Sequence, residues 1–63
     1  MRGAVTEFNE AAGLGVVAGD DGVDYRFHCV EIADGSRTIE VGATVTFRPL
    51  RKLGLVEAAD LRP

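Results

Sequence analysis

The sequence predicts an all-β domain, in which five short strands close into a small barrel. Two segments alternate apolar and polar residues, and glycines alternate with apolar residues between positions 13 and 17. Alternation with a period of two indicates strands with one buried face, and no segment long enough for a useful helix shows helical spacing. So small a sheet must curl and close, because a flat one would leave its edges open.

Length and cysteine content place the chain at the lower limit of independent folding. It has 63 residues, which we take as one domain, and a single cysteine, Cys29, that has no partner for an internal disulfide. No apolar run approaches the roughly 20 residues of a membrane span, and residues 1–4 lack the apolar stretch of a signal peptide. We therefore expect a cytoplasmic protein that does not bind membranes.

Charge argues against strong binding to phosphate. Seven Lys and Arg residues stand against ten Asp and Glu residues, which gives a formal charge of −3. A nucleic-acid-binding domain usually carries a basic stripe, so an acidic chain binds phosphate tightly only where its cations gather on one face.

The first half of the chain predicts a hairpin. Residues 3–9 suit a first strand with Val5 directed inward, and residues 10–12 form the turn into a second strand over residues 13–18. Residues 19–22, Gly-Asp-Asp-Gly, read as a tight turn rather than the start of a helix, which excludes a dinucleotide-binding phosphate loop. Alternating glycines in the second strand predict that backbones approach closely there.

The third strand is predicted over residues 23–29. Its inner face carries Tyr25, Phe27 and Cys29, and its outer face carries Asp24, Arg26 and His28. Residues 30–32 are expected to form one tight helical turn, and residues 33–37 a polar surface loop.

The last two strands follow a similar pattern. In the fourth, Ala43, Val45 and Phe47 are predicted to point inward, and Thr44, Thr46 and Arg48 outward. Pro49 is expected to end this strand because it removes a hydrogen-bond donor. Residues 50–54 then form the last connection, and residues 55–61 the fifth strand.

The order and spacing of these residues resemble a known family. The motifs are Gly3-x-Val5-x-x-Phe8-Asn9-x-x-x-Gly13-Leu14-Gly15-Val16-Val17, Asp24-x-x-Phe27-His28 with Ile32, Gly35-x-Arg37-Thr38-Ile39-x-x-Gly42-x-x-Val45-x-Phe47 and Ala58-Ala59-Asp60-Leu61. Over essentially its whole length the chain resembles the bacterial cold-shock domain. The resemblance implies a five-stranded antiparallel barrel of the oligonucleotide-binding type that holds single-stranded DNA or RNA.

The chain departs from the family mainly where the family places outward aromatic residues. The substituted positions are Glu7, Leu14, Val16, Arg26, Cys29 and Ser36, and Thr6 and Ala12 replace two typical lysines. Stacking is worth about 1–3 kcal/mol per base, so the loss of these rings costs on the order of 6 kcal/mol, or about four orders of magnitude in affinity. The resemblance therefore implies the fold more firmly than the activity.

The candidate nucleic-acid-binding residues are Phe8, Leu14, Val16, Arg26, His28, Arg51 and Lys52. Arg26 and His28 share the outer face of the third strand, where both side chains can stack on a base. Phe8 either offers a ring at the rim of this face or packs over the end of the barrel. Arg51 and Lys52 lie in the last connection, where they either flank the groove or are ordinary surface cations.

Leu14 and Val16 have two interpretations. Directed outward, they form an exposed apolar patch of the kind that binds a protein. Alternatively, they cover the sheet and touch bases weakly.

No arrangement of residues indicates catalysis or a cofactor. Cys29 and His28 are neighbours on a predicted strand and point to opposite faces, and the chain has no further Cys or His to complete a metal site. Asp20, Asp21 and Asp24 lack the spacing of a calcium loop and are interpreted as turn formers. We expect a protein that is not an enzyme and holds neither metal nor cofactor.

The leading hypothesis is a cold-shock-like barrel that binds single-stranded RNA or DNA weakly. The alternative is a protein-interaction module on the same barrel, with a partner that binds through Leu14 and Val16 and no remaining affinity for nucleic acid. The choice between DNA and RNA stays open, and a monomer is the default for this architecture.

Overall fold

The computed structural model describes residues 1–63, with the exception of the side chain of Lys52. Its elements are β1 (Arg2–Asn9), β2 (Leu14–Gly19), β3 (Asp24–His28), the short 3-10 helix η1 (Cys29–Glu31), β4 (Thr44–Lys52) and β5 (Leu55–Arg62). The prediction of an all-β domain with five strands is confirmed. Within the described part, no helix is long and apolar enough to cross a membrane.

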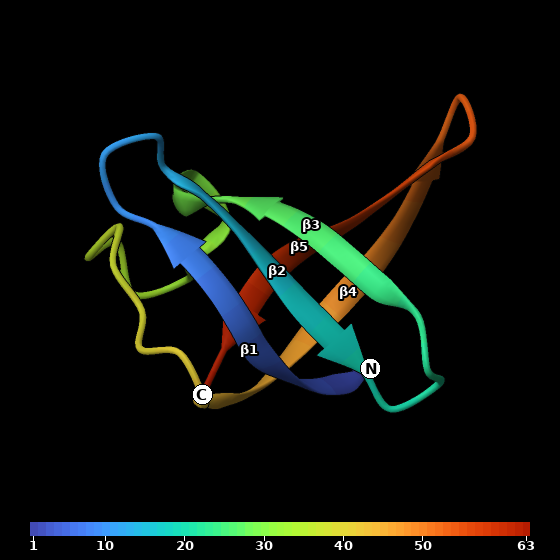
Figure 1. The fold of residues 1–63 in the computed structure, drawn as a ribbon, viewed down its shortest axis with the longest axis horizontal. Coiled ribbons are helices and arrows are strands. Elements are labelled where there is room, and N and C mark those ends of the chain that lie inside the picture. The colour runs from blue at the N-terminus through green and yellow to red at the C-terminus, as the bar shows by residue number, and fades with distance from the viewer.

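The five strands form one closed sheet in the order β1-β2-β3-β5-β4 (Figure 1). Four contacts are antiparallel, but β3 and β5 pair in parallel through Arg26 and Glu57, so a fully antiparallel sheet is a wrong expectation. The reason is one of parity. Strand directions cannot alternate all the way around a closed sheet with an odd number of strands, so one contact must be parallel.

The core lies inside this closed sheet and consists of Val5, Val17, Tyr25, Phe27, Ile32, Val45, Phe47, Ala58, Ala59 and Leu61. The core includes the predicted inward residues Val5 of β1, Tyr25 and Phe27 of β3, and Val45 and Phe47 of β4, which confirms the faces of those strands. Ala43, also predicted inward, is half-buried and precedes β4. The rings of Tyr25 and Phe47 lie 5.0 Å apart at a tilt of 58°, a favourable edge-on arrangement.

Gly15 is a point of close approach between β2 and its two neighbouring strands. A Cβ atom at this position would lie 2.4 Å from Cζ of Phe27 and 2.8 Å from the backbone oxygen of Glu7. Only glycine fits here, as the alternation of glycines in β2 predicts. The space lets the ring of Phe8 stack on that of Phe27, with centroids 6.0 Å apart and planes 4° from parallel.

A β-bulge at Thr6 changes the faces of β1. Val5 pairs with Val17, whereas Glu7 pairs with Val16, so Thr6 is an extra residue in β1. Strict alternation from the buried Val5 would turn Glu7 inward. The bulge instead directs Glu7 to the outer face.

Cys29 belongs to η1 rather than to the third strand, which corrects its predicted place on the inner face. Its N–H group donates to the backbone oxygen of Gly13 at 2.8 Å, and its own oxygen accepts from the N–H group of Ile32 at 3.2 Å. The helical turn therefore begins one residue earlier than predicted. Cys29 is half-buried and packs against the core, and Ile32 of the same segment is buried in it.

Pro49 does not end the fourth strand, because β4 continues through it to Lys52. Phe47 donates its N–H group to Met1 on the β1 edge of β4. Pro49 lies two residues further on, so its nitrogen faces the same edge beyond the start of β1. No donor is needed there, and the opposite edge of Pro49 pairs with Ala58 of β5. Arg51 and Lys52 consequently lie in a strand and not in a loop.

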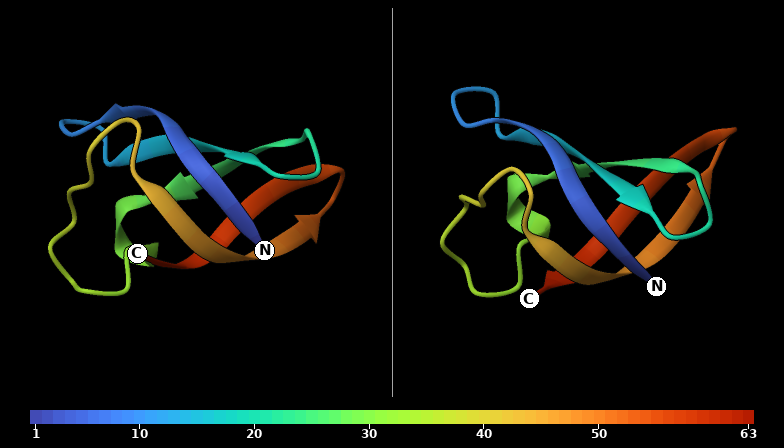
Figure 2. Two further views of the ribbon diagram at one scale, coloured as in Figure 1. Left: turned by 90° about the horizontal axis from the view of Figure 1, so that it is seen from below. Right: turned by 60° about the horizontal axis from the view of Figure 1, so that its bottom comes forward.

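The connection between β4 and β5 is a two-residue turn, Leu53-Gly54, because Lys52 pairs with Leu55. Figure 2 shows that this hairpin and the long loop between η1 and β4 lie at opposite ends of the molecule. The β4–β5 hairpin around Leu53 and Gly54, called the distal hairpin below, extends beyond the other strands in both views.

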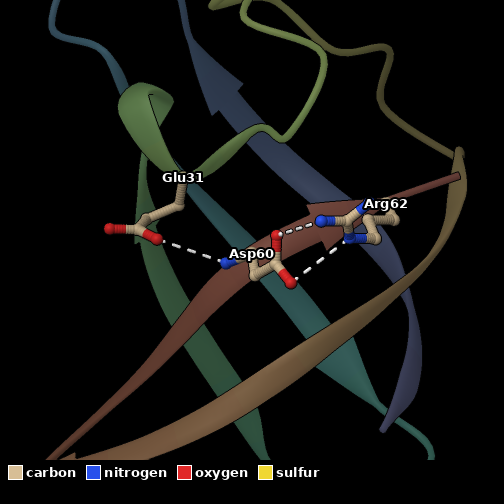
Figure 3. A network of polar contacts seen from close by, with 3 residues as sticks. All are labelled: Glu31, Asp60 and Arg62. Carbon is tan, nitrogen blue, oxygen red and sulfur yellow. Dashed lines mark hydrogen bonds and ion pairs between the residues drawn. The ribbon is translucent and has the colours of Figure 1, made fainter.

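A small polar network joins η1 to the end of β5 (Figure 3). The backbone N–H group of Asp60 donates to Glu31 at 3.2 Å, and the side chain of Arg62 contacts both carboxylate oxygens of Asp60. Asp60 has a φ of 54°, and the register of β4 and β5 shifts beside it. The bulge thus turns the strand so that Leu61 bridges to Ile32 in the core.

Candidate nucleic-acid interface

The outer face of the sheet is built from two rows of paired residues. The first row runs from Glu7 of β1 through Val16 and Arg26 to Glu57 of β5. Residues that pair directly across strands share a face, so these four side chains lie side by side. The parallel β3–β5 contact completes this row, because it places Glu57 next to Arg26.

The second row lies nearer to η1. It consists of Asn9, Leu14 and His28, which pair across β1, β2 and β3. Leu14 is 47% exposed and His28 is exposed beside it. This row therefore places an apolar side chain against the imidazole.

The two rows line an open groove with a volume of about 1000 Å³. Its walls are Glu7, Phe8, Asn9, Leu14, Gly15, Val16, Asp24, Arg26, Phe27, His28, Val41, Gly54, Leu55, Val56 and Glu57. The distal hairpin supplies one wall, and Val41 from the long loop supplies part of another. Segments from most of the chain thus contribute to one surface.

The groove brings together five of the seven residues predicted from the sequence. These are Phe8, Leu14, Val16, Arg26 and His28. Arg51 is exposed on β4 and is not among the lining residues, and it pairs with Val56, which is one of them. The prediction for Lys52 concerns a side chain outside the described part of the structure.

Phe8 fits both predicted interpretations, since its ring packs against the core and also contributes to the groove. Its ring stacks on the buried ring of Phe27, and it also lines the groove while remaining partly exposed. A planar ligand can therefore continue the stack from Phe27 through Phe8.

Apolar side chains form much of the groove surface. Val16 is half-buried in its floor, and Leu14, Val41 and Leu55 are 47%, 62% and 59% exposed along its sides. Both interpretations of Leu14 and Val16 require this outward direction, so the structure leaves both open.

The carboxylates of the groove are its least expected feature. Glu7, Asp24 and Glu57 stand there against one guanidinium, that of Arg26, and the imidazole of His28. The alternation of the third strand predicts that Asp24 points outward. No local pattern predicts that Glu57 lies in the groove, because its position depends on closure of the sheet through the β3–β5 contact. Among the described residues, no carboxylate lies within ion-pair distance of Arg26.

Asp21 lies outside the groove and stabilises the turn between β2 and β3. One carboxylate oxygen accepts from the N–H group of Val23 at 3.1 Å, and the other accepts from the hydroxyl of Tyr25 at 2.5 Å. The hydrogen bond from Tyr25 lowers the pKa of Asp21, and the same bond raises the pKa of Tyr25. Asp21 therefore acts as the turn former that the sequence predicts.

Within the described part of the chain, no three His, Cys, Asp or Glu side chains gather closely enough to hold a metal ion. Cys29 is a free thiol, and a Cβ atom at Gly13 would lie 2.9 Å from its sulfur. Cys29 also packs against the hydrophobic core.

A scan against models of protein families finds no match for this chain, and a search of curated proteins finds none either.

Proposed function

We propose that the chain is a cold-shock-like domain of the oligonucleotide-binding fold, and that its groove binds single-stranded RNA or DNA weakly. The observation that carries this proposal is the convergence of Phe8, Leu14, Val16, Arg26 and His28 on one groove of a closed five-stranded sheet. These residues come from three neighbouring strands, β1, β2 and β3.

Bases, rather than phosphates, make most of the contacts in this proposal. A base stacks on Phe8, neighbouring bases lie over Leu14 and Val16, and Arg26 and His28 offer further planar groups. Affinity is low because aliphatic side chains stand where aromatic rings would stack. Repulsion between the groove carboxylates and phosphate lowers it further.

The proposal is tested by titration of short labelled single-stranded DNA and RNA, followed by fluorescence anisotropy. We expect saturable binding, and Arg26→Ala and His28→Ala should each weaken it several-fold without unfolding the domain. Arg48→Ala is the matched control, since Arg48 is an exposed cation on β4 outside the groove. Unchanged affinity in both groove variants would remove this surface from consideration.

A protein-interaction module is the second candidate function. It is favoured by the exposed Leu14, Val41 and Leu55 together with the excess of carboxylates in the same groove. Under this alternative, Leu14→Lys abolishes self-association or capture of a partner, while oligonucleotides bind to neither variant. Tighter oligonucleotide binding by Leu14→Lys would contradict it.

A further inference from the structure

In the row of Glu7, Val16 and Arg26, an acidic and a basic side chain lie on the two sides of the apolar Val16. Neighbouring strands are about 4.8 Å apart, so the backbones of Glu7 and Arg26 are separated by roughly 10 Å with Val16 between them. Both charged side chains are exposed, and neither has a hydrogen bond or ion pair with another described residue. A flat ligand that rests on Val16 therefore meets one side chain at each edge.

The two edges differ in what they accept from a ligand. The guanidinium of Arg26 only donates hydrogen bonds, in a planar fork, and the carboxylate of Glu7 only accepts them. The matching ligand is planar, with two acceptors on one edge and two donors on the other.

Among the nucleobases, guanine has this arrangement. Its O6 and N7 atoms accept a bidentate contact from Arg, and its N1–H and N2 amino groups donate in parallel to a carboxylate. Adenine turns an amino group toward the guanidinium, and uracil and thymine lack the amino group and the N7 acceptor. Cytosine offers an amino donor but lacks N7.

We infer that Glu7 and Arg26 select guanine in a single strand, with the base lying over Val16. This inference rests on the proposed function, since it specifies which base the groove prefers. Arg26 contacts O6 and N7, and Glu7 accepts from N1–H and the N2 amino group. Glu7 is thereby a specificity-determining residue.

The surroundings of Arg26 favour contact with a base over contact with phosphate. Glu57 is its direct neighbour on β5, and Glu7 lies on its other side beyond Val16. A phosphate at Arg26 would thus lie between two carboxylates that repel it. An uncharged base that donates to a carboxylate meets no such penalty.

Substitution of single atoms in the ligand tests this assignment. The probes are short thymidine oligonucleotides with one central guanine, replaced in turn by inosine, which lacks the N2 amino group, and by 7-deazaguanine, which lacks N7. The proteins are the unaltered chain, Glu7→Gln and Arg26→Ala, with Glu10→Gln as control because Glu10 is an exposed glutamate in the β1–β2 turn outside the groove.

We expect the unaltered chain and Glu10→Gln to bind guanine about tenfold more tightly than inosine, since a bidentate pair discriminates on this order. Glu7→Gln should reduce that ratio toward one, and Arg26→Ala should remove the preference for guanine over 7-deazaguanine. Equal binding of guanine and inosine by the unaltered chain, or a preference that survives in Glu7→Gln, would overturn the inference and leave the proposed function standing. If no oligonucleotide binds at high protein concentration, the proposed function fails and the inference fails with it.

Discussion

Gly15 is a single residue on which both the packing of the strands and the shape of the groove depend. Its missing side chain provides the space that the Phe27 ring and the Glu7 backbone occupy. The same residue pairs with Phe8 and Phe27 across the sheet, so it supports the stacked rings that line the groove. Close packing of strands and the shape of the groove are therefore set at one position.

Gly15→Ala should destabilise the domain by about 1–3 kcal/mol or more, because backbone as well as a core ring must shift to admit the methyl group. Gly35→Ala is the comparison, since Gly35 has open space around it and a φ of 75°. That variant loses about 1 kcal/mol through backbone strain alone. Urea denaturation measures both, and a smaller loss for Gly15→Ala would contradict the close approach.

The hydrogen bond between Tyr25 and Asp21 links stability to pH at both ends of the scale. The bond lowers the pKa of Asp21 in the folded state, so its contribution is present above the unfolded pKa of Asp and is lost as the pH falls through the folded value. The bond raises the pKa of Tyr25, so the contribution is also lost as the pH rises through that folded value, above about 10.

Tyr25→Phe should therefore lower the melting temperature most between about pH 5 and pH 9, and the difference from the unaltered chain should shrink in acid below about pH 4. Melting curves over a pH series measure this. A difference that stays constant down to pH 2 would show that Asp21 is not the partner that matters.

At the scale of elements, the hairpin β4–β5 is built on an unfavourable turn residue. Leu53 and Gly54 have φ values of 49° and 79°, and the side chain of Leu53 is fully exposed. Positive φ at both central residues is typical of type I′ turns, which favour Asn-Gly, and a branched apolar residue in this conformation is strained. No packing interaction of Leu53 compensates for the strain.

Leu53→Asn should stabilise the domain by about 1 kcal/mol, since it relieves this strain without loss of buried surface. Leu55→Asn is the control, because Leu55 is an exposed leucine within β5, where Asn is disfavoured. Thermal denaturation distinguishes the two. Equal effects would indicate a general benefit from removing exposed leucine instead of relief of the turn.

At the scale of the whole molecule, charge limits how nucleic acid can bind. The chain carries a formal charge of −3, and the groove itself contains Glu7, Asp24 and Glu57. Within the groove, phosphate contact is thus limited to Arg26 and His28 at most. Affinity must come mainly from bases, which distinguishes this groove from a basic phosphate-binding surface.

The salt dependence of oligonucleotide binding should accordingly be shallow. Two phosphate contacts correspond to a slope of about 1.4 or less in a plot of log affinity against log salt concentration, taking roughly 0.7 per contact for single strands. Anisotropy titrations at several salt concentrations measure the slope. A value above about 3 would place binding on another, more basic surface.

Sequence pattern alone accounts for most of the strands and for the core residues of β1, β3 and β4. Alternation in β3 and β4 fixes which side chains are buried, because a strand that turned them outward would expose its aromatic residues to water. The same alternation predicts the outward directions of Arg26 and His28. The spacing of Gly13 and Gly15 likewise predicts a close approach between strands before any partner is known.

The composition of the groove was decided by tertiary structure. A bulge at Thr6 turns Glu7 outward against the local alternation, and sheet closure brings Glu57 beside Arg26 from a distant strand. Pro49 remains within β4 because β1 has ended on its donor side, which no local rule reveals. The periodicity of a strand's sequence indicates which of its faces is buried. Register and closure depend instead on pairings between strands far apart in sequence. For this reason only the folded chain determines which charged side chains lie next to one another.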